Sequence, residues 1–105
     1  MIEMSTISNI VYRIVSSVSP DKIYLFGSYA TGQANENSDI DLLVIKDTVE
    51  PRYKRSIEIQ RLLIGSKIPA DIVVYTNAEF EKERFIQFSF INSAIQGAQL
   101  MYERK

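Results

Sequence analysis

Residues 26–32 (FGSYATG) and residues 38–45 (SDIDLLVI) decide how this chain of 105 residues folds. The first segment follows a short apolar run, and the second opens a longer one. Apolar runs of this length, bounded by Gly and Asn, are typical of buried β-strands. We therefore expect the Gly-Ser pair to lie at the C-terminal end of one strand, and Asp39 and Asp41 to lie at the start of the next.

The two aspartates are the first candidate functional residues. Asp39 and Asp41 are two positions apart, so on a strand their side chains point to the same face, with Cα atoms about 6.6 Å apart. Carboxylates held side by side repel and raise each other's pKa unless a cation lies between them. Oxygen ligands of this kind suit Mg²⁺, which commonly binds one or two carboxylates together with substrate phosphates. The pair therefore predicts a magnesium site, although a single carboxylate would be enough to cap the preceding loop.

The Gly-Ser pair at positions 27 and 28 predicts the other half of the site. Gly27 would allow a phosphate to approach the backbone. If Ser28 opens a helical turn, its hydroxyl and the free N–H groups behind it form an anion site. The pair on its own is typical of an ordinary strand-to-helix turn. Beside a carboxylate pair that binds metal, it predicts phosphoryl or nucleotidyl transfer.

The full motif resembles that of a known family. Gly27, Ser28, Gly32 and residues 38–41 resemble the GSxxxG…SDxDL pattern of the DNA polymerase beta-like nucleotidyltransferase superfamily, and the small size is similar to its minimal nucleotidyltransferase (MNT) branch. We expect an α+β fold, a small mixed β-sheet with helices packed on it, in one domain over residues 1–105. Many members carry Arg just before the second glycine, where this chain has Thr31.

The resemblance implies a role for each site residue. Asp39, Asp41 and Asp71 would be the catalytic carboxylates and would bind Mg²⁺, with two ions expected, and Gly27 and Ser28 would hold the phosphates of ATP. Asp71 precedes an apolar run, as the third carboxylate of the family does, and would complete the metal site and prepare the attacking hydroxyl. Its other interpretation is a surface carboxylate beside a nearby lysine.

The implied reaction is transfer of AMP from ATP to a hydroxyl of a partner protein. Similar MNT proteins pair with HEPN-domain ribonuclease toxins and act as antitoxins that adenylylate a tyrosine of the toxin, so the resemblance implies this role here. We expect a partner to supply the acceptor surface, because a nucleotidyltransferase normally needs a second lobe and this chain has no room for one. Two alternatives stay open: a nucleotidyltransferase acting on a small molecule such as an aminoglycoside, and an antitoxin acting by binding alone.

The composition excludes several other classes of function. Proteins that bind nucleic acid usually carry an excess of positive charge, whereas this chain has a net charge of -1. We therefore expect no direct contact with nucleic acid. The chain has no cysteine or histidine, which excludes disulfides, zinc sites of the usual kind and histidine-based triads. No apolar stretch approaches the roughly 18 residues of a membrane span, and no signal pattern opens the chain, so we expect a cytoplasmic protein.

Periodicity predicts the remaining elements. Strands are expected over residues 22–26, 39–46, 69–75 and 98–103, and helices over residues 5–18, 28–31, 51–64, 78–84 and 85–96. The helix over residues 51–64 has a basic side, which we interpret as solvated and which consists of Arg52, Lys54, Arg55 and Arg61. In the helix over residues 85–96, Phe90 falls outside the apolar stripe.

Overall fold

The computed structural model describes residues 1–105 and contains one mixed sheet of four strands in the order β3-β2-β1-β4. The strands are β1 (Lys22–Phe26), β2 (Ile40–Ile45), β3 (Ala70–Tyr75) and β4 (Gln99–Glu103). The helices are α1 (Met4–Val18), α2 (Ser28–Thr31), α3 (Arg52–Arg55), α4 (Ile57–Leu63), α5 (Asn77–Glu83) and α6 (Phe90–Ala94). These elements confirm the predicted α+β fold. None of the helices is long and apolar enough to cross a membrane.

Strand β2 is the centre of the molecule. It pairs antiparallel with β1 and parallel with β3, and β1 pairs antiparallel with β4. A parallel pair needs a crossover connection, which α3 and α4 provide between β2 and β3. All residues of β2 except Asp41 are buried, as expected for a strand covered on both faces.

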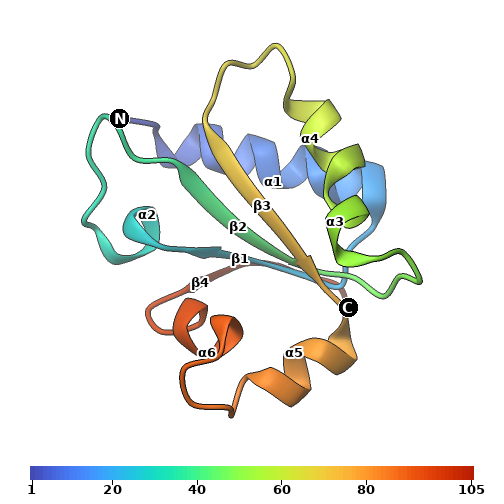
Figure 1. Cartoon of the computed structure of the whole chain (residues 1–105). Coiled ribbons are helices and arrows are strands. Elements are labelled where there is room, and N and C mark those ends of the chain that lie inside the picture. The colour runs from blue at the N-terminus through green and yellow to red at the C-terminus, as the bar shows by residue number, and fades with distance from the viewer.

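Helices cover both faces of the sheet (Figure 1). On one face, which we call the α1–α4 face, Ile40, Leu42 and Val44 of β2 pack in a cluster with apolar residues of α1 and α4. On the opposite face, the α5–α6 face, Leu43 and Ile45 pack with apolar residues of α5 and α6. Because side chains alternate along a strand, Asp41 lies on the α5–α6 face with Leu43.

Helix α1 forms because its apolar residues recur at helical spacing. The residues of this side are all buried and are Ile7, Ile10, Val11, Ile14 and Val18. The helix ends where Ser19 adopts a left-handed conformation (φ 49°) before Pro20. It begins at Met4 with Glu3 as N-cap residue and no side-chain cap, so the sequence-based choice of Ser5 as N-cap residue is wrong by two residues.

The predicted helix over residues 51–64 is two helices, α3 and α4, which meet at Ser56. Arg55 at the end of α3 is not on a solvated face, because its side chain is only 9% exposed. It donates to the Glu50 carbonyl and forms an ion pair with Glu79 of α5, with 2.6 Å between Nη1 and Oε1. At the other end of the predicted helix, Ile64 lies outside α4 and is 77% exposed.

The predicted helix over residues 85–96 is wrong for its first half. Phe88 has a φ of 69°, which no α-helix accommodates. Ser89 explains the break, because its hydroxyl donates to the Glu83 carbonyl at the end of α5 and accepts from the Asn92 N–H at the start of α6. The Asn92 side chain likewise donates to the Arg84 carbonyl. These bonds satisfy groups that a continuous helix would have paired internally.

Helix α5 is held against α3 by one carboxylate. Glu79 completes a capping box with Thr76, in which each side chain bonds the other residue's backbone N–H. The same carboxylate accepts two hydrogen bonds from Arg55. The hydrogen bonds from Arg55, with those from Thr76 and the nearby charges, hold the pKa of Glu79 at about 2, below its ordinary value of 4.5, against the opposing effect of burial.

We expect the contribution of Glu79 to stability to depend on pH. A carboxyl whose folded pKa is lowered stabilises the fold above its unfolded pKa of 4.5, and loses that contribution as the pH falls toward about 2. Urea unfolding should therefore show Glu79→Gln to be less stable than the wild type at pH 7, by about 1–3 kcal/mol, as for hydrogen bonds to charged groups. The difference should shrink between pH 4.5 and 2. A difference of the same size at pH 2.5 would contradict this account.

Candidate functional site

The sheet register places two of the three candidate carboxylates side by side. Asp41 on β2 pairs with Asp71 on β3 and, on its other side, with Phe26 on β1. Partners on neighbouring strands lie about 4.8 Å apart, and their side chains share a face. Asp39 precedes β2 by one residue and has the same parity as Asp41. The sequence therefore predicted correctly that Asp39 and Asp41 lie at the start of β2, and the register adds Asp71 and Phe26 beside them.

The three carboxylates lack positive partners. Asp39, Asp41 and Asp71 form no ion pair with Lys or Arg. Asp39 and Asp71 are exposed, whereas Asp41 is half-buried. Burial, followed by repulsion from Asp71 and then from Asp39, raises the pKa of Asp41 above its ordinary value. The site thus holds negative charge that a cation would stabilise.

Gly27 is required by the position of Asp41. Its φ of 73° and ψ of -156° fall in a region that is essentially restricted to glycine. A Cβ atom at this position would also overlap Oδ2 of Asp41. The sequence suggested that this glycine makes room for a phosphate, and the structure adds that it makes room for the carboxylate.

Helix α2 begins directly after this glycine, and Figure 1 shows it beside the end of the sheet where β2 starts. Ala30 and Thr31 donate backbone hydrogen bonds to the Gly27 carbonyl. The Thr31 hydroxyl lies 3.4 Å from the carbonyl oxygens of Gly27 and Ser28 and donates to both. The hydroxyl of Thr31, an exposed residue, therefore braces the turn through backbone carbonyl groups. Ser28, half-buried at the first position of α2, is available for a ligand.

The loop between α2 and β2 is held by its own side chains. Asn35 accepts from the Asn37 N–H through its side chain, and its own N–H donates to the Ser38 hydroxyl. The Ile40 N–H then donates to the Pro69 carbonyl, which starts the pairing of β2 with β3. This turn fixes the backbone just before Asp39. The Ser38 hydroxyl of the motif therefore has a structural role, because it accepts the Asn35 N–H.

The carboxylates fit a hard divalent cation by their chemistry. The structure contains no group of three Asp, Glu, His or Cys side chains already arranged to hold a metal ion. The backbone nevertheless brings Asp39, Asp41 and Asp71 to neighbouring positions, and their mutual repulsion affects the pKa of Asp41. Oxygen-only donors with uncompensated charge are the ligands that Mg²⁺ prefers.

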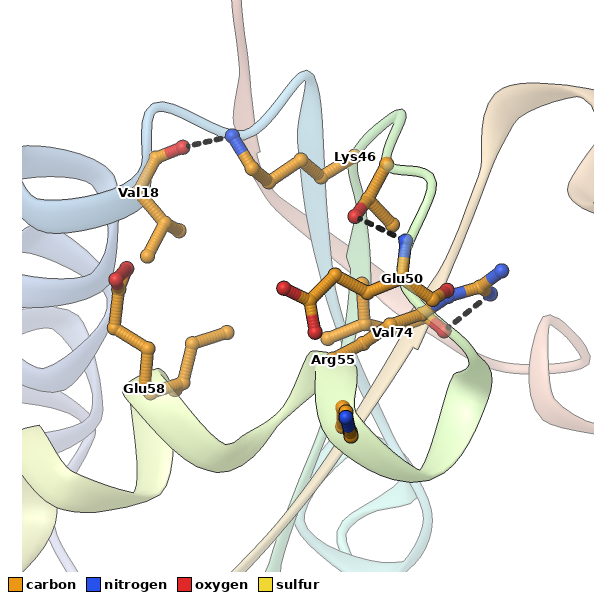
Figure 2. Close-up of a pocket in the computed structure, with 9 residues that line it drawn as sticks. Val18, Lys46, Glu50, Arg55, Glu58 and Val74 are labelled. Atoms are coloured by element: carbon orange, nitrogen blue, oxygen red, sulfur yellow. Dashed lines mark hydrogen bonds between the residues drawn. The ribbon is translucent and has the colours of Figure 1, made fainter.

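The best-enclosed cavity lies at the other end of β2. It has a volume of about 180 Å³ and is lined by residues that include Lys46, Glu50, Arg55 and Glu58. Lys46 follows the last residue of β2. Figure 2 shows its side chain donating to the Val18 carbonyl at the edge of the cavity. A second, apolar cavity of about 290 Å³ lies beside α4. Neither cavity includes a candidate carboxylate, and the exposure of Asp39 and Asp71 leaves the acidic site open to solvent.

Comparison with known proteins shows similarity over most of the chain. Residues 4–96 match the family model described as nucleotidyltransferase domain. A relative from Methanocaldococcus jannaschii, MJ0604, to which the function of a protein adenylyltransferase is ascribed, is 33% identical over 81 residues, covering 77% of each chain.

Solved structures agree in fold. A crystal structure from Sulfolobus solfataricus, of a protein to which nucleotidyltransferase function is ascribed, superimposes with a TM-score of 0.65 and 25% identity, over 93% of this chain and 78% of the other. Two toxin–antitoxin structures, one with AMP-PNP and one of a MntA–HpeT mutant, each give a TM-score of 0.58. They are 21% and 22% identical, over 93% of this chain and 74% of theirs.

We expect the elevated pKa of Asp41 to depend on Asp71. In the metal-free protein, carbon-13 NMR of the carboxyl carbons should give Asp41 a pKa above 3.8, and Asp71→Asn should lower it only in part, because burial remains the largest cause. Asp47→Asn, which changes a carboxylate beyond the other end of β2, is the matched control and should leave it unchanged. An unaltered Asp41 pKa in Asp71→Asn would show that the two side chains do not interact.

Two glycines of the same motif allow a matched comparison. Gly27 and Gly32 both have positive φ, but a Cβ at Gly32 meets nothing within 4 Å. Gly32→Ala should therefore cost only the left-handed conformation, about 1–2 kcal/mol of the free energy of unfolding. Gly27→Ala should cost more and should also shift the Asp41 pKa, because the methyl group displaces that carboxylate. Equal costs in urea unfolding, with an unchanged Asp41 pKa, would disprove the close contact.

Proposed function

Because the chain belongs to the nucleotidyltransferase domain family, we propose that it transfers AMP from ATP to a hydroxyl group and releases pyrophosphate. The observation that carries this proposal is the pairing of Asp41 with Asp71, beside Asp39 and without positive partners. Carboxylates without positive partners, next to the first residues of α2, suit a magnesium-bound triphosphate.

Each residue of the motif has a role in this proposal. The Ser28 hydroxyl and the backbone at Gly27 hold the phosphates of ATP, because α2 begins there beside Asp41. Asp39, Asp41 and Asp71 hold Mg²⁺, with two ions expected. Magnesium bound at these carboxylates supplies positive charge to the triphosphate and favours the deprotonated form of the attacking hydroxyl.

The chemical step is an in-line displacement at the α-phosphorus. The acceptor oxygen forms a bond to the α-phosphorus, and the bond from that phosphorus to the oxygen that bridges to the β-phosphate breaks. The bonding electron pair leaves with pyrophosphate. Asp71 takes the proton of the acceptor hydroxyl; it is the more exposed member of the Asp41–Asp71 pair and lies where an acceptor from solvent can reach it.

We propose a partner protein as the acceptor. The carboxylates lie outside both cavities, and an open site suits the surface of a macromolecule better than a small molecule that must be enclosed. The protein adenylyltransferase function ascribed to MJ0604 supports the same class of acceptor. The likeness in fold to toxin–antitoxin structures supports an antitoxin that modifies a HEPN-type toxin. Because ATP is the donor, we expect the reaction to take place in the cytoplasm.

The first test is transfer of label from α-labelled ATP with Mg²⁺, in a lysate of the source cells, with products separated by size. The wild type should label one discrete protein. Asp39→Asn and Asp41→Asn should each lower the transfer about 100-fold or more, since metal ions contribute several kcal/mol to such reactions. Glu36→Gln, an exposed carboxylate in the same loop, is the matched control and should transfer normally.

The other outcomes separate the alternatives. Label on a small molecule would assign the chain to transferases that modify compounds such as aminoglycosides. A chain that binds a defined protein without labelling it would be an antitoxin that acts by contact alone. Unchanged transfer in Asp39→Asn or Asp41→Asn would refute the assignment of these carboxylates as metal ligands.

A further inference from the structure

Aromatic side chains lie next to the acidic site on the α5–α6 face. Phe26 is the cross-strand partner of Asp41, so both side chains point to this face at the same level of the sheet. The rings of Phe26 and Phe90, the first residue of α6, are nearly perpendicular (86°), with 5.7 Å between their centroids. Aromatic rings therefore lie beside Asp41 on the α5–α6 face.

Phe90 is held in place and is still accessible. Its other neighbour is Tyr75, which stacks on it at 5.8 Å with an angle of 19° between the rings. Ser89 caps α6 and anchors it to the end of α5, which fixes the position of the residue that follows. Even so, Phe90 is 42% exposed, so part of its surface has no partner in the chain.

The Phe90 ring lies between the two ends of β2 and is connected to the acidic end by Phe26. Tyr75 pairs with Ile45 at one end of β2, and Phe26 pairs with Asp41 near the other end. A ring that contacts both Tyr75 and Phe26 must lie over the middle of β2, between Asp41 and the C-terminal end of the strand. Phe90 is thus linked to the site through Phe26, the cross-strand partner of Asp41.

We propose, on the basis of the proposed function, that Phe90, supported by Phe26, is the stacking platform for the base of the bound nucleotide. A nucleoside triphosphate has a charged end, which the motif around Ser28 and Asp41 would hold, and a flat aromatic base. The base would extend from the carboxylates onto the aromatic surface that adjoins them. Stacking on an aromatic side chain strengthens binding by roughly 5- to 150-fold per base, and every base has a face suited to it.

This assignment has a consequence for specificity. A platform that recognises the face of the base makes the presence of a base more important than its identity. We therefore expect purine nucleotides to bind with similar affinity, and tripolyphosphate, which has no base, to bind more weakly.

The test compares two probes on the whole chain with Mg²⁺ by titration calorimetry: α,β-methylene-ATP, which is not cleaved at the reacting bond, and tripolyphosphate. Phe90→Ala should weaken binding of the nucleotide about 10-fold and leave binding of tripolyphosphate unchanged. Phe90→Tyr should restore nucleotide binding, because it keeps the aromatic face. Phe85→Ala removes a more exposed phenylalanine (79%) outside this contact and should change neither affinity.

Phe90→Leu protects the test against loss of folding, since it keeps an apolar side chain between Phe26 and Tyr75. With an unchanged melting temperature, it should weaken nucleotide binding as Phe90→Ala does. Equal weakening of both probes, or no weakening of the nucleotide, would overturn the platform. Loss of binding to the partner protein with normal nucleotide affinity would also overturn it, and would make this surface a docking site.

The two proposals fail in different ways. A wild type that binds and transfers the nucleotide, together with a Phe90→Leu variant of normal affinity, would reject the platform alone. A wild type whose nucleotide binding depends on Phe90, but which transfers no label, would reject the proposed reaction and keep the platform. A wild type that binds neither probe would reject both.

Discussion

The half-burial of Asp41 beside two other carboxylates at the start of β2 is the constraint on which the candidate site depends. Asp41 is half-buried between Phe26 and Asp71, and its elevated pKa reflects both the burial and the neighbouring negative charges. Such an arrangement costs stability in the absence of a cation. The remainder of β2 offsets the cost, because its last four residues are almost completely buried under helices on both faces. A rigid strand thus carries a charged, open end.

The opposite end of the sheet is reinforced by ion pairs. Arg55 of α3 and Glu79 of α5 meet there, and the Arg52 guanidinium lies 4.2 Å from the ring centre of Tyr75. Arg52, Arg55 and Glu79 form ion pairs at this end, whereas the carboxylates at the start of β2 have no positive partner. A cluster of unpaired carboxylates in which one pKa is raised is a feature of functional sites. The cavity near Arg55 lies at this end of the sheet and takes no part in the proposed chemistry.

Local sequence patterns predicted the elements whose cause is local. All four strands and the turn at residues 28–31 lie within a residue of the predicted positions, because short apolar runs between turn formers have few other solutions. The errors occur at Ser56 and at residues 85–89, where side chains form hydrogen bonds that helical periodicity does not reveal. Arg55 turns inward to Glu79, and Ser89 takes over the carbonyl of Glu83, so helical periodicity on its own misled the prediction.

The sequence by itself determined that Asp39 and Asp41 share a face, because residues two apart on a strand always do, and it placed Gly27 and Ser28 at the end of the preceding strand. Only the tertiary structure decided what else lies beside Asp41. Strand order and register, which depend on contacts between distant segments, bring Asp71 to one side and Phe26 to the other. The same packing brings Phe90 against Phe26 and leaves no space for a side chain at Gly27.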